Sequence, residues 1–171
     1  MLKKLRAISA TKYYWLALAI LFVGLEGAAL FYQYVLNYGP CVLCIHVRII
    51  VMGMLIVALV GLFIRRHPAA LLGVSLVMTG LLAILFERSY QLLGVERGFI
   101  TGSCGFDSGL PGWFAIDKWF PYMFKIWESC GYTPVLLFGI TMAEALIVLS
   151  AVLLMLNILI NIAVMTDQAR K

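Results

Sequence analysis

Charged side chains are scarce in this sequence. Lys, Arg, Asp and Glu make up 12% of its 171 residues, against about a quarter in soluble domains. The chain is also 64% hydrophobic, with a mean hydropathy of +1.02. These values exclude an ordinary soluble domain and indicate an integral membrane protein.

The sequence also lacks the motifs of several common functions. It has no glycine-rich nucleotide-binding motif, no Ser/His/Asp triad pattern and no internal repeat. Asp and Glu number only 8 against 13 Lys and Arg, which gives a formal net charge of +5. In a membrane protein a basic excess is read segment by segment, because it reports topology. No nucleic-acid partner is therefore expected.

Four apolar stretches are long enough to cross a bilayer as helices: residues 14–36, 45–64, 69–86 and 143–163. We take the fourth stretch to begin at Ala143, because this start places Glu144 at the membrane interface, where a carboxylate costs less free energy than in the hydrocarbon core. The first is too long for the apolar core of a signal peptide, so a retained helix is expected. We predict one all-α domain over residues 1–171, a four-transmembrane-helix bundle with periplasmic loops at 37–44 and 87–142.

Basic residues gather on one side of this bundle. Eight lie in the N-terminal segment, the turn after the second span and the C-terminus: Lys3, Lys4, Arg6, Lys12, Arg65, Arg66, Arg170 and Lys171. The long loop on the other side has Arg88, Arg97, Lys118 and Lys125, diluted by acidic residues. The positive-inside rule therefore predicts that both termini are cytoplasmic.

All four cysteines, Cys41, Cys44, Cys104 and Cys130, fall in the two outward loops. An outward compartment such as a periplasm permits disulfides, and four cysteines allow three connectivities. Their spacing favours Cys41 with Cys44, which leaves Cys104 with Cys130.

The stretch Cys41-Val42-Leu43-Cys44 has the Cys-x-x-Cys spacing of disulfide oxidoreductases. Pro40 suits a helix start, which puts Cys41 in or next to the first turn of the second span, where a thiolate is favoured. A structural disulfide is one alternative, but so short a loop removes little unfolded-chain entropy. A zinc site is another, although Cys104 and Cys130 lack zinc-ribbon spacing. Redox chemistry is favoured, and no metal site is expected.

Besides Glu144 at the interface, the spans contain two charged residues, Glu26 and Arg48, at positions where charge is costly and often functional. Arg48 follows Cys44 by four residues and shares its helix face. It either snorkels to the lipid headgroups or stabilises a thiolate or the oxygen of an electron acceptor. For Glu26 we expect a structural polar contact, with a protonated state or a proton route left open.

Other residues carry weaker expectations. Asn157 and Asn161 are expected to form an interhelical hydrogen-bond site, and Gly24 and Gly27 to allow close helix packing. Arg88 and Gln91 are candidates to line a quinone site, and His46 is as readily an interfacial residue as a proton donor. The aromatic stretch Leu110–Phe124 (LPGWFAIDKWFPYMF) predicts a short helix lying in the membrane interface.

Together, the Cys41-Val-Leu-Cys44 motif followed by Ile45 and Arg48, the four spans and the second cysteine pair closely resemble the bacterial disulfide bond formation protein B family. The resemblance runs from about Trp15 to the end of the fourth span. It includes Glu26 and the stretch Ile116-Asp117-Lys118-Trp119.

The resemblance implies a thiol oxidase of the bacterial inner membrane. A reduced thioredoxin-like periplasmic dithiol oxidase of the DsbA type would attack the Cys104–Cys130 disulfide, with Cys104 forming the mixed disulfide. Electrons would pass to Cys41–Cys44, and Cys44 would donate them to a bound quinone, ubiquinone or menaquinone, beside Arg48. A vitamin K epoxide reductase-like enzyme and a non-catalytic scaffold with structural disulfides are the alternatives.

Overall fold

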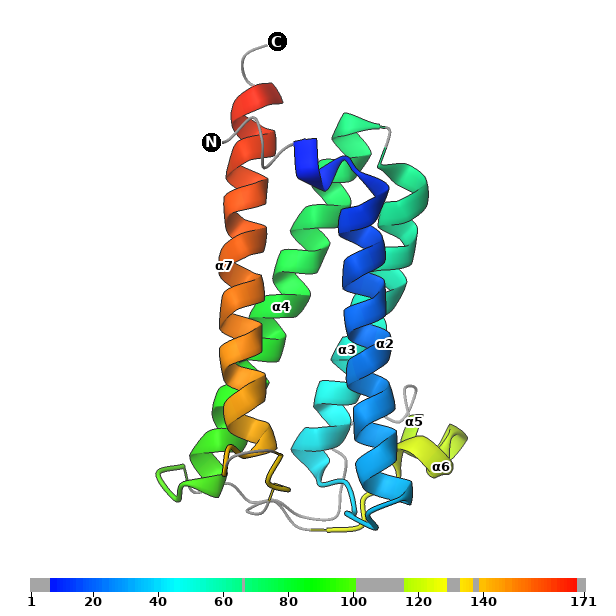
Figure 1. The fold of residues 1–171 in the computed structure, drawn as a ribbon, viewed down its shortest axis with the longest axis vertical. Coiled ribbons are helices and arrows are strands. Elements are labelled where there is room, and N and C mark those ends of the chain that lie inside the picture. Colours follow the sequence, from blue (N-terminus) through cyan, green and yellow to red (C-terminus); the bar gives the residue numbers. More distant parts are fainter. Residues whose placement is uncertain (1–6, 66, 101–115, 129–132, 137–138, 169–171) are drawn as a thin grey trace.

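The computed structural model describes residues 7–65, 67–100, 116–128, 133–136 and 139–168, whose main feature is a bundle of four long helices (Figure 1). The long helices are α2 (Lys12–Tyr34), α3 (Val42–Ile64), α4 (Pro68–Glu96) and α7 (Met142–Gln168). Two single-turn helices, α5 (Ile116–Trp119) and α6 (Pro121–Phe124), come between α4 and α7 in sequence. The described residues form no β-strand, only an isolated bridge between Val135 and Thr141. The predicted all-α, four-helix architecture is confirmed.

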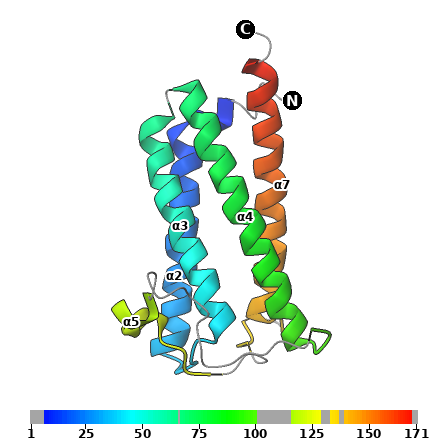
Figure 2. The ribbon, with the colours of Figure 1, turned by 180° about the vertical axis from the view of Figure 1, so that it is seen from behind.

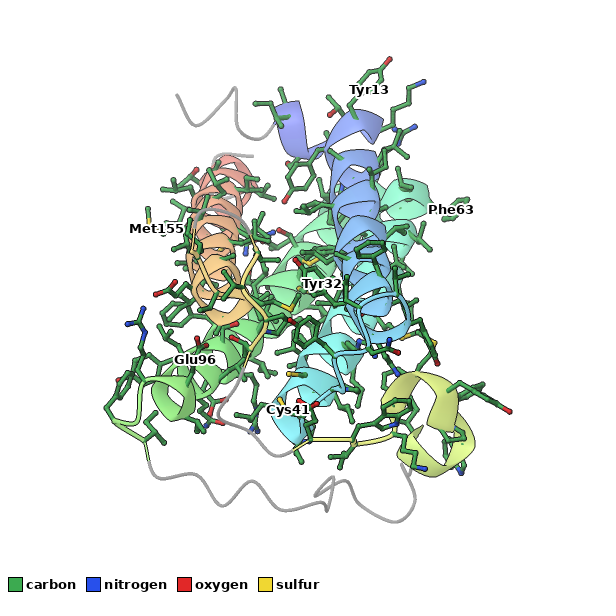
Figure 3. All side chains as sticks on the ribbon, turned by 60° about the horizontal axis from the view of Figure 1, so that its bottom comes forward. Tyr13, Tyr32, Cys41, Phe63, Glu96 and Met155 are labelled. Atoms are coloured by element: carbon green, nitrogen blue, oxygen red, sulfur yellow. The ribbon has the colours of Figure 1, made fainter. Side chains whose placement is uncertain are left out.

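Helices that follow one another along the chain pack side by side. α3 packs against α2 and α4, and α4 also packs against α7. Figure 2 accordingly shows α4 between α3 and α7. The start of α2 and the end of α7 lie at one end of the bundle, and α5 and α6 lie at the other (Figure 1). We call the latter, where Cys41 also lies (Figure 3), the cysteine end.

Large apolar side chains cover the outside of the long helices. Examples are Ile20 of α2, Phe63 of α3, Val77 of α4 and Met155 of α7, all of them exposed. By length and composition each of the four helices can cross a membrane, with mean hydropathies from 1.9 to 2.7. Water solvates such a surface poorly and lipid solvates it well, so the chain is a multi-pass membrane protein.

α2 and α3 pack closely at Trp15 and Gly61. Trp15 is fully buried, and a Cβ placed on Gly61 would overlap its ring. The expectation that Gly24 and Gly27 bring helices together is wrong, because a Cβ at either position would meet nothing within 4 Å. A small residue permits close packing only where a neighbour faces it, and the sequence does not show which face of α2 is covered.

Polar side chains join three of the helices inside the bundle. Asn157 Oδ1 of α7 accepts hydrogen bonds from Ser75 Oγ at 3.2 Å and Thr79 Oγ1 at 2.9 Å, both on α4. Asn157 Nδ2 donates to Tyr14 Oη of α2 at 3.1 Å, and Asn161 Nδ2 donates to Thr79 Oγ1 at 2.6 Å. The interhelical site predicted at Asn157 and Asn161 is confirmed.

All four long helices extend beyond the predicted spans at one end or at both. α3 begins at Val42 rather than Ile45, and α4 continues to Glu96 rather than ending at Phe86. Glu87 and Arg88 end the apolar run, but a charged residue does not end a helix. Gln91 supports the extra turns, since its Nε2 donates to Glu87 at 2.7 Å and its Oε1 accepts from Arg88 at 3.1 Å. Residues 87–96 of the predicted outer loop are therefore helical.

α7 begins with a capping box. Thr141 Oγ1 accepts from the Glu144 backbone N–H at 3.3 Å, and Glu144 Oε2 accepts from the Thr141 N–H at 3.1 Å. The other carboxylate oxygen of Glu144 pairs with Arg97, at the end of α4. These contacts fix the start of α7 beside the end of α4, close to the start predicted at Ala143.

The predicted interfacial helix falls partly outside the described residues. Of the stretch 110–124, residues 116–124 are described, and they form α5 and α6 as two separate turns. Phe120 interrupts them, since Pro121 restricts the residue before it. A position at the membrane surface stays a prediction.

Candidate functional site

Cys41 and Cys44 lie on the first turn of α3, at the cysteine end. Cys41 is the N-cap residue, and its Sγ accepts a hydrogen bond from the Cys44 backbone N–H at 3.2 Å. Cys41 is buried, Cys44 is half-buried, and both carry free thiols in the structure. Pro40 lies directly before this cap, outside the helix. Free backbone N–H groups at a helix start favour negative charge on a nearby sulfur.

The two thiols differ in their surroundings. A hydrogen bond between the two side-chain thiols, together with burial, raises the pKa of the Cys41 thiol above its usual range. Cys41 therefore keeps its proton when one of the pair ionises. The negative charge then falls on Cys44, which makes Cys44 the nucleophilic sulfur of the pair.

Arg48 lies one turn further along α3 and is only 4% exposed. Its Nη1 donates to Gln33 Oε1 of α2 and to the Met123 carbonyl oxygen of α6, both at 2.7 Å. The guanidinium thus faces the inside of the protein and does not snorkel to lipid headgroups. A charge held this way is available to a ligand in the bundle.

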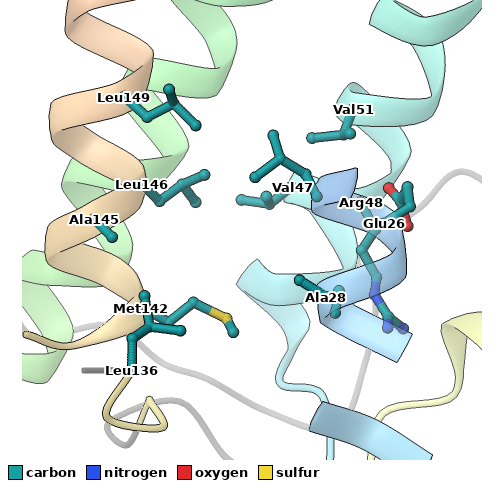
Figure 4. A pocket seen from close by; sticks show the side chains of 12 residues that line it. Glu26, Ala28, Val47, Arg48, Val51, Leu136, Met142, Ala145, Leu146 and Leu149 are labelled. Atoms are coloured by element: carbon teal, nitrogen blue, oxygen red, sulfur yellow. The ribbon is translucent and has the colours of Figure 1, made fainter. Parts of the chain in front are cut away.

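A cavity of about 170 Å³ lies beside Arg48 (Figure 4). On one side are α2 and α3, which contribute Glu26, Arg48 and Val51, and on the other side is α7 with Met142 and Leu146. Val47, which follows Cys44 by three residues, also lines it, so Cys44 lies one turn away on the same helix face. The cavity is apolar except for Glu26 and Arg48, which suits a mostly apolar ligand with few polar atoms.

The carboxyl group of Glu26 has no hydrogen bond within the described part of the chain. Both of its oxygens are buried. It lies within electrostatic reach of Arg48, and Figure 4 shows the two on the same wall of the cavity. The structural polar contact expected for Glu26 is therefore not found among the described residues.

Residues 120–128, here called the α6 segment, are attached to the reactive turn. The Tyr122 carbonyl oxygen accepts from Gln33 Nε2 at 3.2 Å and from the Tyr34 hydroxyl. The Trp127 backbone N–H donates to the Pro40 carbonyl oxygen at 3.1 Å. A Cβ on Gly39 would lie 2.6 Å from the Trp127 Cβ, so the segment crosses the chain just before Cys41 with no space between them.

The other candidates are not brought to this site by the described residues. Arg88 and Gln91 bond to each other on α4 and do not line the cavity. Cys104 and Cys130 lie outside the described residues. No group of three or more His, Cys, Asp or Glu in the described ranges has the arrangement of a metal site.

Sequence reasoning missed how Gln33 and the α6 backbone take part in the site. Gln33 is 3% exposed and bridges Arg48 to the Tyr122 carbonyl. A glutamine inside an apolar span is a weak signal that could have pointed to it. The acceptors on Tyr122 and Met123 are main-chain oxygens, which every residue has, so no sequence pattern identifies them.

Comparison with known proteins gives a consistent result. The family model described as "Disulfide bond formation protein DsbB" matches residues 11–160. A protein named disulfide bond formation protein B from Psychromonas ingrahamii is 33% identical over 143 residues, 75% of each chain. Another of the same name from Haemophilus influenzae is 30% identical over 168 residues, covering 95% of this chain and 93% of the relative.

Proposed function

The chain belongs to the disulfide bond formation protein DsbB family, and from this premise we propose that it is a membrane thiol oxidase that uses a quinone as electron acceptor. A reduced periplasmic dithiol oxidase of the thioredoxin-like DsbA type is its electron donor. The observation that carries the proposal is the placement of Cys44 one turn from a buried arginine that lines an apolar cavity.

The relay runs through two thiol–disulfide exchanges. A donor thiolate attacks the Cys104–Cys130 disulfide at Cys104, and the donor's second thiolate releases it, so the donor leaves oxidised. The dithiol of Cys104 and Cys130 then reduces the Cys41–Cys44 disulfide. In the last net step the Cys41–Cys44 dithiol gives two electrons and two protons to a quinone. The dithiol becomes a disulfide with one new S–S bond, and the quinone becomes a quinol.

The asymmetry of the Cys41–Cys44 pair supports Cys44 as the donor sulfur. When one thiol of the pair ionises, the charge falls on Cys44, and Cys41, which keeps its proton, is positioned to close the disulfide once Cys44 has reacted. Arg48 supplies a fixed positive charge where a quinone oxygen gains negative charge during reduction.

The residues around the cavity fit a quinone. A quinone ring has two carbonyl oxygens and a long apolar tail, and the lining offers one cation and one carboxyl among apolar side chains. The quinone supplies only the electron-accepting chemistry. The chain's own residues hold it beside Cys44, exclude water and stabilise its developing charge.

The attachment of the α6 segment supports the exchange between the two cysteine pairs. Trp127 is hydrogen-bonded to Pro40 and precedes Cys130 by three residues, a length that can span roughly 10 Å. The exposed side chains of Trp119, Phe120 and Tyr122 suit a location in the membrane interface. We propose that this interfacial segment keeps the second pair within reach of the first.

The topology follows from the same premise. α2 starts at Lys12 and α3 is capped by Arg65, and these two helix ends lie at the end of the bundle opposite the cysteine end. We propose that this end faces the cytoplasm of the bacterial inner membrane, so that both cysteine pairs meet the periplasm.

Two electron donors test the proposal with purified full-length protein in detergent. A reduced thioredoxin-like dithiol oxidase should drive quinone reduction by the wild type, but not by Cys104→Ser or Cys44→Ser. When dithiothreitol, which reduces Cys41–Cys44 directly, replaces the protein donor, Cys104→Ser should regain quinone reduction and Cys44→Ser should not. Folded protein that reduces no quinone with either donor would instead favour a scaffold with structural disulfides.

A further inference from the structure

The cavity contains one ionisable group to which the proposed relay gives no role. Both carboxyl oxygens of Glu26 are buried, and no described group hydrogen-bonds to them. Gln33 and Asn157, in contrast, accept hydrogen bonds from Arg48 and from Thr79. A buried carboxyl without a partner is costly, so its position at a ligand cavity calls for a ligand-based explanation.

Glu26 is not simply the counter-ion of Arg48. The two attract each other, but they form no direct ion pair in the structure, and Arg48 Nη1 is hydrogen-bonded to Gln33 and Met123 instead. A carboxylate that far into a span without a direct partner is expensive, whereas a neutral carboxyl is much less so. A neutral carboxyl also has an O–H that can donate a hydrogen bond, which a carboxylate lacks.

We propose that Glu26 is protonated in the resting protein, donates a hydrogen bond to a carbonyl oxygen of the bound quinone, and supplies a proton to that oxygen during reduction. This inference rests on the proposed function. The cavity then presents a cation, Arg48, and an acid, Glu26, to a ligand that gains two electrons and two protons.

The step balances in atoms and charge. The Cys41 thiol and the Cys44 thiolate together lose two electrons and one proton and gain one S–S bond. The quinone gains the two electrons and two protons as quinol, one proton by way of Glu26 and the other from the water that took up the Cys44 proton when that thiol ionised. Glu26 transfers its proton to one quinone oxygen and becomes a carboxylate beside Arg48. It then recovers a proton that originates from the Cys41 thiol, so it is unchanged after each turnover.

Infrared difference spectroscopy tests the protonation and the contact without turnover. The full-length Cys44→Ser protein, which cannot pass electrons, is compared with and without a benzoquinone that has one isoprenoid unit. We expect a C=O band of a protonated carboxyl that shifts when the quinone binds and disappears in Glu26→Gln. The matched control is Glu87→Gln, which changes an exposed carboxylate on α4 and should leave the band in place.

The outcomes separate this inference from the proposed function. If the quinone does not bind to the wild type or to Cys44→Ser, both fail. If the quinone binds but the protonated-carboxyl band is absent, or persists in Glu26→Gln, the role of Glu26 is wrong and the relay stands.

Kinetics give a second, independent readout. Glu26→Gln keeps a hydrogen-bond donor but has no transferable proton, so quinone affinity should be retained while kcat falls about 100-fold. Glu26→Asp should recover part of kcat, because it restores an acid. Loss of quinone affinity with unchanged kcat in Glu26→Gln would overturn the proton-donor role.

Discussion

Arg48 Nη1 and the Met123 carbonyl oxygen are 2.7 Å apart, although 75 residues separate them in sequence. This hydrogen bond joins the helix that contains Cys41 and Cys44 to the segment that leads toward Cys130. Arg48 also lines the cavity in which we propose that a quinone binds. Arg48 therefore connects two parts of the proposed relay, and its removal should affect both.

Replacing Arg48 with Gln should raise the KM for quinone about tenfold or more, because a hydrogen bond from a charged group is lost. Hydrogen exchange at residues 121–127 should also become faster, since Met123 loses its partner. Arg48→Lys keeps the positive charge but loses the planar guanidinium with its several N–H donors, so its changes in quinone KM and in exchange should be smaller than those of Arg48→Gln. Arg88→Gln, at an arginine remote from the cavity, is the control. An Arg48→Gln protein with normal quinone KM and normal exchange would refute the connection.

Gly39→Ala should disturb the attachment of the α6 segment. Its new Cβ would lie 2.6 Å from the Trp127 Cβ, so the segment has to move away from Pro40. We expect turnover with the protein donor to fall about tenfold to 100-fold through misplaced thiols, and turnover with dithiothreitol to change little. Gly24→Ala, where a Cβ meets nothing within 4 Å, should change neither rate. Equal losses with both donors would contradict the account.

Gly61→Ala should destabilise the bundle by about 1–3 kcal/mol, because its Cβ would overlap the buried ring of Trp15. Gly27→Ala should be neutral or slightly stabilising, since it adds a better helix former in open space. Thermal unfolding of both variants in the same detergent measures the difference. A similar Tm for the two would show that the Trp15–Gly61 contact is not close in solution.

Asn157→Leu should cost about 0.6–2 kcal/mol of stability, because it removes the hydrogen bonds that join α7 to α4 and α2. Unfolding by denaturant in micelles measures this change. Leu156→Ala, on the exposed neighbouring position, is the control for an altered lipid-facing surface. No loss of stability in Asn157→Leu would mean that the network contributes nothing net.

The raised pKa of Cys41 predicts selective alkylation in the reduced protein. A thiol with a raised pKa stays protonated at pH values where an ordinary cysteine begins to ionise, so Cys41 should react slowly with iodoacetamide even at pH 9. Cys44, which carries the charge of the pair, should react first. Peptide mass spectrometry after brief labelling between pH 6 and pH 9 measures both. Faster labelling of Cys41 would reverse the assignment of the nucleophile.

The features that depend on local sequence were predicted well. Apolar runs located the four long helices, and Pro40 before Cys41 located the start of α3 to within a few residues. The pair Asn157 and Asn161 indicated an interhelical site, because buried amides in a span need partners. Each of these rests on residues within a few turns of one another.

Features that depend on which surfaces meet were not predictable. Hydropathy predicts an end near Phe86 for α4, but the helix continues to Glu96, because hydropathy falls at Glu87 while helix propensity does not. The close approach at Gly61 depends on Trp15, far away in sequence, and nothing in the chain distinguishes Gly61 from Gly24. Arg48 donates one of its hydrogen bonds to the Met123 main-chain oxygen, and no sequence pattern identifies such an acceptor.

The central claim is tested most directly by the stoichiometry of a single anaerobic turnover. Fully oxidised protein would be mixed with a limiting amount of reduced dithiol oxidase and excess quinone, and the donor disulfide and the quinol would both be counted. The account predicts one quinol for each donor disulfide in the wild type and none in Cys44→Ser. Donor oxidation without quinol, or quinol formation in Cys44→Ser, would contradict it.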